Sequence, residues 1–189
     1  MYLLSYIIYI STEGDEWASA DNWLNGNVSV CDWYPGNSCD PPKNRRRVLQ
    51  VGNSIQIREL RLNKNNLAGT LPSELEFLTD LQVLHLGLNQ LEGTLPSVLG
   101  TLSNLQEFDR QNQGFSGPIP PEYGNLEFLR LFDVRDNDLT GNIPSEFGAL
   151  SNLKRFLARN NDLSSSLPSK LGNLAQLTEF EVDGNKLTG

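Results

Sequence analysis

The sequence is poor in the residues that most enzymes and zinc proteins use. Its 189 residues contain a single histidine, His85, and two cysteines, Cys31 and Cys39. These are too few ligands for a structural zinc site, and they leave few candidates for general-base chemistry. We therefore expect no metal, no cofactor and no catalytic residue, and we predict that the protein is not an enzyme.

Positive charge and long apolar runs are also scarce. Fifteen lysines and arginines stand against 23 acidic residues, which gives a net charge of −8 and argues against nucleic acid as a partner. The opening run from Met1 to Ile10 is about half as long as a membrane-spanning helix. We interpret it as a short capping helix, with a clipped signal peptide as the alternative. Membrane attachment is expected only through segments outside these residues.

Apolar residues recur at a fixed interval of 24 from Ile57 onward. Each unit reads L-x-x-L-x-L-x-x-N-x-L-x-G-x-L-P, and a constant period of this length indicates a repeat architecture. The units begin at Ile57, Leu81, Leu105, Leu129, Leu153 and Leu177. The second half of each unit adds apolar positions, among them Leu75 and Leu78, which we expect to line the opposite wall of the fold.

The two halves of each unit are expected to differ in conformation. The L-x-L alternation predicts a strand with one buried face, whereas the proline-containing half must turn away from the sheet. A single unit cannot bury its leucines, so neighbouring coils must stack about 4.8 Å apart with parallel strands. The asparagine of the pattern offers both donors and an acceptor, which predicts an interior ladder of hydrogen bonds at Asn65, Asn89, Asn137, Asn161 and Asn185.

The unit, with its L-x-G-x-I/L-P segment, resembles the plant-type extracellular leucine-rich repeat. That family includes receptor-kinase ectodomains and polygalacturonase-inhibiting proteins. The resemblance implies an α/β repeat fold: a right-handed solenoid with parallel strands on the concave face and an additional short strand in the L-x-G-x-I/L-P segment. It divides the chain into an N-terminal cap, residues 1–56, and leucine-rich repeats, residues 57–189, of which five are complete and the sixth is truncated.

The segment before the repeats resembles the N-terminal cap of the same family. Large aromatic residues and a cysteine pair would cover the apolar edge of the first coil: Trp17, Trp23, Cys31, Trp33 and Cys39. A disulfide between the cysteines would imply an oxidising compartment, and hence an extracellular or cell-surface location, with two free thiols as the alternative. Asn27 begins a glycosylation sequon, and Val48 to Val51 is a candidate cap strand.

Solvent-facing strand positions form columns that run from coil to coil, and these make the expected ligand-binding surface. His85 beside Asp109 suggests a base with its carboxylate, a pH-sensitive contact or an ordinary exposed histidine. Three leucines stand where the pattern expects polar residues, and surrounding arginines would make them an interface core. The candidate ligand-binding residues on the concave face are Arg61, His85, Leu88, Asp109, Arg130, Leu131, Asp133, Arg135, Arg155, Leu157 and Arg159.

The third unit departs from the pattern at two positions. Arg110 replaces the leucine of the strand, and Gln113 replaces the ladder asparagine. Because an unpaired buried guanidinium is costly, we predict that Arg110 turns outward or pairs with Asp109 or Asp133. We weigh sequence drift without function against a notch that is shaped for a ligand.

These observations predict a binding module. The resemblance implies extracellular recognition of a protein, peptide or glycan ligand by part of a receptor-like surface protein that takes part in signal transduction. A secreted inhibitor of a cell-wall-degrading hydrolase and a structural or adhesive surface protein are the alternatives. Four apolar residues at the end of the sequence lack a following coil, which predicts self-association through the C-terminal end: Leu177, Phe180, Val182 and Leu187.

Overall fold

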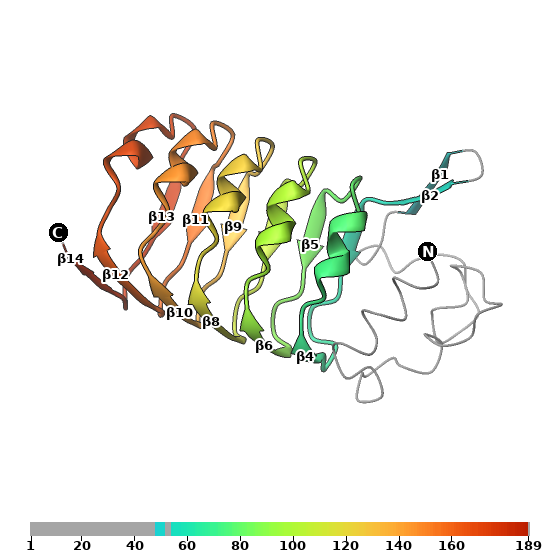
Figure 1. Ribbon diagram of the computed structural model, residues 1–189, viewed down its shortest axis with the longest axis horizontal. Coiled ribbons are helices and arrows are strands. Elements are labelled where there is room, and N and C mark those ends of the chain that lie inside the picture. The colour runs from blue at the N-terminus through green and yellow to red at the C-terminus, as the bar shows by residue number, and fades with distance from the viewer. Residues whose placement is uncertain (1–47, 52–53, 189) are drawn as a thin grey trace.

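The computed structural model describes residues 48–51 and 54–188 and shows a solenoid of stacked coils (Figure 1). The predicted cap strand is present: β1 (Val48–Val51) pairs antiparallel with β2 (Ser54–Ile57). The rest of the proposed cap lies outside the described residues, and with it lie Cys31, Cys39 and Asn27. Among the described residues, no helix has the length and apolar character needed to cross a bilayer.

The L-x-L segments form the first of two six-stranded parallel sheets. Every strand is offset from the next by 24 residues, so Leu60 lies beside Leu84 and Leu84 beside Phe108. The predicted parallel stacking is therefore confirmed. The strands are β3 (Glu59–Arg61), β5 (Val83–His85), β7 (Glu107–Asp109), β9 (Leu131–Asp133), β11 (Arg155–Leu157) and β13 (Glu179–Glu181).

The L-x-G-x-I/L-P segments form the second sheet, as the resemblance implied. Its glycines, such as Gly93 and Gly117, have positive φ angles of 85° and 75°, which favour glycine because a Cβ would be strained there. Ser165 takes the same conformation in the fifth coil. The strands are β4 (Ala68–Thr70), β6 (Gln90–Thr94), β8 (Gly114–Pro118), β10 (Asp138–Gly141), β12 (Asp162–Ser166) and β14 (Lys186–Thr188).

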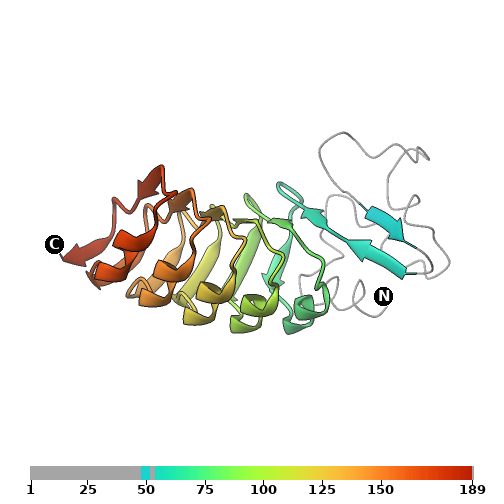
Figure 2. The ribbon, with the colours of Figure 1, turned by 90° about the horizontal axis from the view of Figure 1, so that it is seen from above.

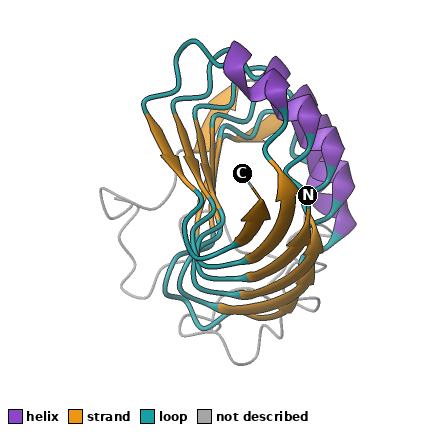
Figure 3. Ribbon diagram, turned by 90° about the vertical axis from the view of Figure 1, so that its left-hand side faces the viewer, coloured by secondary structure: helices purple, strands orange, loops and turns teal. Residues whose placement is uncertain are grey.

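A short 3₁₀ helix follows the proline of each complete coil. Proline fixes its own φ angle and lacks an amide hydrogen, so it ends the strand and favours the turn. Seen along the solenoid, the two sheets and the row of helices form three walls around the core (Figure 3), and the helices line one edge (Figure 2). They are η4 (Ser73–Phe77), η5 (Ser97–Thr101), η6 (Pro121–Asn125), η7 (Ser145–Ala149) and η8 (Ser169–Asn173).

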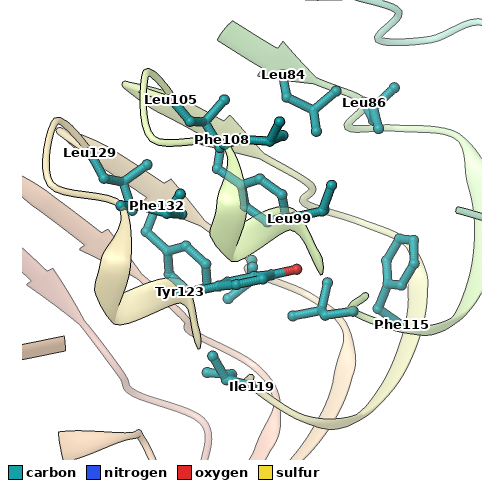
Figure 4. Packing of buried hydrophobic residues seen from close by; sticks show 14 of the residues in the cluster. Leu84, Leu86, Leu99, Leu105, Phe108, Phe115, Ile119, Tyr123, Leu129 and Phe132 are labelled. Atoms are coloured by element: carbon teal, nitrogen blue, oxygen red, sulfur yellow. The ribbon is translucent and has the colours of Figure 1, made fainter. Parts of the chain in front are cut away.

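Side chains from all three walls meet in one continuous core (Figure 4). In the third and fourth coils, Phe108 and Phe132 replace the central leucine and stack with ring centroids 5.6 Å apart, while Tyr123 packs edge-on against both. The Tyr123 hydroxyl donates to the carbonyl of Pro96, so its polar atom is satisfied. Full burial of each such side chain contributes about 2 kcal/mol.

The predicted asparagine ladder is present in the interior at Asn89, Asn137, Asn161 and Asn185. The amide nitrogen of Asn137 donates to the carbonyls of Arg110, Val134 and Arg135, and its oxygen accepts from the amide of Phe115. Asn89, Asn161 and Asn185 make the equivalent bonds. Each side chain joins two coils through backbone groups that would otherwise be buried unpaired.

Gln113 keeps part of this pattern in the third coil. Its oxygen accepts from the amide of Leu91, and its nitrogen donates to the carbonyl of Leu86, so the link to the second coil is preserved. Its nitrogen makes no bond to carbonyls of its own turn. The extra methylene moves the amide group toward the second coil. This explains why Gln113 keeps its hydrogen bonds to the second coil and loses those to the carbonyls of its own turn.

Candidate binding surface

The surface of the first sheet that faces away from the core carries most of the predicted site residues, and we call it the concave face. Parallel register aligns its side chains in columns with a spacing of about 4.8 Å. One column runs through Arg61, His85 and Asp109 and continues through Asp133, Leu157 and Glu181. The predicted site residues in β3 to β11 therefore share one surface.

His85 is held between opposite charges at the N-terminal end of this face. Its Nδ1 lies 2.8 Å from Nη1 of Arg61, and its Nε2 lies 2.9 Å from a carboxylate oxygen of Glu107. Arg61 can only donate, so the arrangement fits a neutral ring that accepts at Nδ1 and carries its proton on Nε2, where Glu107 lies at ion-pair distance without a hydrogen bond of normal geometry. Burial and the nearby Arg61 lower the pKa of His85, although Asp109 and Glu107 act in the opposite direction.

The pairing of His85 with Asp109, one of the three alternatives for this histidine, is not formed, because Arg61 and Glu107 occupy the two ring nitrogens. Asp109 is buried, and its Oδ1 accepts from the backbone amide of Gln111 at 3.3 Å. Glu107 was not among the predicted site residues, although it stands in the column next to His85. Arg61 also bonds Glu59 at 3.0 Å, so both sides of the histidine are tied into one ionic network.

The C-terminal half of the face contains a second ionic network, built on Arg135. Its guanidinium donates two hydrogen bonds to Asp133, at 2.9 and 2.7 Å, and lies 3.5 Å from Glu181. Asp133 is only 3% exposed, and its hydrogen bonds to Arg135 raise the pKa of that arginine. Such a bidentate pair fixes the orientation of both side chains.

This network explains a wrong prediction about Leu157. We predicted an apolar contact that faces solvent, but Leu157 is 0% exposed. Leu157 lies in register between Asp133 and Glu181, and Arg135 is hydrogen-bonded to the first of these carboxylates and lies at ion-pair distance, 3.5 Å, from the second. The guanidinium therefore spans the coil of Leu157 and covers it, so Leu157 is not available to a ligand.

The remaining predicted residues lie at the surface. Leu131 is partly buried, and Leu88 is 42% exposed with a φ angle of 58°. Arg130 and Arg159 are exposed and make no ion pair within the described residues, and Lys154, which we had not selected, lies beside Arg130. Arg155 is also exposed and pairs with Glu179 of the next strand.

The prediction for Arg110 is also wrong. Its side chain neither turns outward nor pairs with a carboxylate: it is 0% exposed, and its three guanidinium nitrogens have no hydrogen-bond partner among the described residues. The guanidinium carbon instead lies 3.7 Å from the ring centroid of Phe115 and 5.4 Å from that of Phe108. Desolvation lowers its pKa to about 9. The aromatic faces supply the partner that sequence reasoning did not consider.

Comparison with known proteins agrees with this geometry. A leucine-rich repeat family model matches residues 56–78, 80–102 and 128–150. The chain belongs to the leucine-rich repeat family. Its repeats are of the type found in plant receptor ectodomains, because solved structures of such ectodomains are similar to it in both sequence and fold. Among curated proteins, no significant match was found.

Two similar structures are large receptor ectodomains of the leucine-rich repeat family. The Arabidopsis thaliana receptor kinase GASSHO1/SCHENGEN3, solved in complex with CASPARIAN STRIP INTEGRITY FACTOR 2, is 41% identical with a TM-score of 0.69. The match covers 70% of this chain and 16% of that ectodomain. The plant peptide hormone receptor RGFR1, solved with RGF2, is 34% identical with a TM-score of 0.69, over 69% of this chain and 21% of the receptor. The leucine-rich repeat chain described here thus spans about a fifth or less of either ectodomain.

A smaller leucine-rich repeat ectodomain is similar over its whole length. The BIR2 ectodomain from Arabidopsis thaliana is 27% identical with a TM-score of 0.78, and the match covers 100% of this chain and 94% of that one. The leucine-rich repeat fold therefore extends over the whole described array.

Proposed function

We propose that this chain is an extracellular recognition module that binds a protein or peptide on its concave face, as part of a receptor-like surface protein. The observation that carries the proposal is that the inward and outward residues of each coil have different roles. Leucines, phenylalanines and ladder asparagines hold the coils in strict register, while the outward positions of the same strands vary from coil to coil. A rigid scaffold with variable side chains is how repeat proteins present binding surfaces.

The similar ectodomains support a peptide or protein ligand. GASSHO1/SCHENGEN3, RGFR1 and HAESA were all solved with peptide or protein factors bound. A glycan ligand has less support from the surface itself, because the outward positions of the six strands β3 to β13 contain no phenylalanine, tyrosine or tryptophan on which a sugar ring could stack.

The proposal carries several predictions about the rest of the chain. Residues 1–56 would form the cap and residues 57–189 the repeat array. We propose a disulfide between Cys31 and Cys39 and a glycan on Asn27, because an extracellular location would permit both. The module would act by binding, without catalysis of its own.

Selection of peptides from a displayed random library on the purified chain tests the proposal. Q82W/Q106W places bulk on two partly buried polar positions of the concave face, and S103W/E127W places the same bulk on exposed positions after the 3₁₀ helices. Selected peptides should lose binding to the first variant and keep binding to the second. Equal binding to both variants would place recognition elsewhere and overturn the proposal.

A further inference from the structure

The fourth and fifth coils present three cations that no carboxylate among the described residues neutralises. Arg130, Lys154 and Arg159 are exposed and have no ion pair within the described part of the chain. The cations near them behave differently, since Arg135 is bound by Asp133 and Arg155 by Glu179. We call Arg130, Lys154 and Arg159 the free cation cluster.

Two members of the free cation cluster lie side by side. The amide of Lys154 donates to the carbonyl of Arg130 at 2.9 Å, and both residues occupy the same column in consecutive coils. Each residue directly precedes a strand, β9 or β11, so their side chains leave the backbone about 4.8 Å apart, close enough for one carboxylate to contact both. Like charges at this spacing repel by about 1 kcal/mol in water, and an anion between them removes that repulsion.

The third member, Arg159, lies farther along the fifth coil, two residues after the end of β11. Arg159 occupies the column of Arg135, and the side chain of Arg135 reaches Asp133 and Glu181 across the concave face. The amide of Asp136 donates to the carbonyl of Arg159 at 2.9 Å, which places Arg159 directly beside the fourth coil. Asp183 follows in the same column but forms no ion pair with it among the described residues. Arg159 follows Lys154 by five positions, a path of roughly 16 Å.

The cluster stands out against the charge of the whole protein. The net charge is −8, and the exposed 3₁₀ helices carry acidic residues such as Glu122 and Glu146. A partner with carboxylates would be repelled by most of the surface and attracted to this region, which favours one docking position.

We propose that the free cation cluster binds an extended acidic segment of a partner protein, with one carboxylate between Arg130 and Lys154 and a second at Arg159. This inference rests on the proposed function and names the chemistry of its ligand. Leu131, partly buried next to Arg130, offers the segment an apolar contact. A peptide is favoured over an acidic glycan because the concave columns contain no phenylalanine, tyrosine or tryptophan.

A defined probe tests the cluster directly. The probe is a ten-residue peptide of alternating glutamate and glycine with a rhodamine label, and binding is followed by fluorescence anisotropy at low salt. R130Q/K154Q/R159Q removes the cluster, and K64Q/K170Q/K186Q removes three exposed cations elsewhere, with the same change in net charge. The first variant should weaken binding at least tenfold, and the second less than twofold. A glutamine–glycine peptide should not bind the parent chain.

Three results would overturn the inference. The parent chain fails to bind the acidic peptide, both variants lose affinity equally, or labelled oligogalacturonate binds the parent chain and not R130Q/K154Q/R159Q while the peptide binds neither. Circular dichroism melting curves confirm that both variants are folded.

The library selection separates this inference from the proposed function. Selected peptides that need the concave face, show no acidic bias and bind R130Q/K154Q/R159Q normally would refute the cluster and leave the proposed function standing. Selected peptides that tolerate Q82W/Q106W would refute the proposed function instead.

Discussion

Replacement of Arg110 by leucine tests how the core tolerates a buried charge. Desolvation lowers the pKa of Arg110 well below its ordinary value, to about 9. Since each pKa unit corresponds to about 1.36 kcal/mol, the charged side chain costs the folded state roughly 5 kcal/mol. Its cation–π contact with Phe115 returns about 2 kcal/mol. Leu62 and Leu86 fill the same position in the first two coils, so Arg110→Leu should raise the free energy of unfolding by about 3 kcal/mol.

Urea denaturation at pH 7 measures this difference, with Arg159→Leu as an exposed control that should change stability by less than about 0.5 kcal/mol. A second measurement at pH 10 separates charge from packing. The unfolded arginine stays protonated there, whereas the folded one loses its proton above about pH 9, so the parent chain regains stability relative to the variant. The advantage of Arg110→Leu should shrink between pH 7 and pH 10, by at most about 1.4 kcal/mol, because the cation–π contact favours the charged form and raises the pH at which the folded arginine loses its proton.

The reasoning fails if Arg110→Leu is destabilising at pH 7. It also fails if the advantage of the variant is the same at both pH values, because the charge would then not be the source of the cost. A stabilised variant that still binds every selected peptide would assign Arg110 to sequence drift and reject a ligand-shaped notch at the third coil.

Three further predictions concern single residues. Leu88→Gly should stabilise the chain by about 1 kcal/mol in urea denaturation, because φ is 58° and the side chain is exposed, and a loss of stability would contradict a strained turn. Asn137→Ala should cost about 3 kcal/mol, since it leaves buried backbone groups unpaired, and an unchanged denaturation midpoint would show that the ladder is dispensable. His85 has a lowered pKa, so the unfolded state binds more protons just below pH 6.5. The parent chain should therefore lose stability relative to His85→Gln as pH falls through that value, by less than about 1.4 kcal/mol per pH unit, and a gain would contradict the neutral ring between Arg61 and Glu107.

Local pattern was sufficient to predict the scaffold. The interval of 24 residues places Leu60 and Leu84 at equivalent positions, and identical coils bury such residues only by stacking in register. The ladder was predictable for a similar reason, because an amide group suits two sets of backbone donors and acceptors. The second sheet came from the family resemblance and not from the periodicity of the chain.

The surface was less predictable, because its side chains contact residues of the next coil or of the coil after that, about 24 or 48 positions away in the sequence. Glu107 contacts His85 instead of Asp109, and Lys154 joins Arg130 only because the coils place them side by side. Their shared column was visible in the sequence. The sequence alone did not decide which members would be neutralised by a partner.

The sequence by itself determined a repeating coil, its strand register and its interior ladder, because each of these follows from a short pattern that is satisfied in the same way in every unit. Only the tertiary structure decided that Leu157 is covered by Arg135 and that Arg110 remains inside against Phe115. Long, flexible side chains reach across several coils, so their positions depend on the sum of charges and packing around them and not on any local motif.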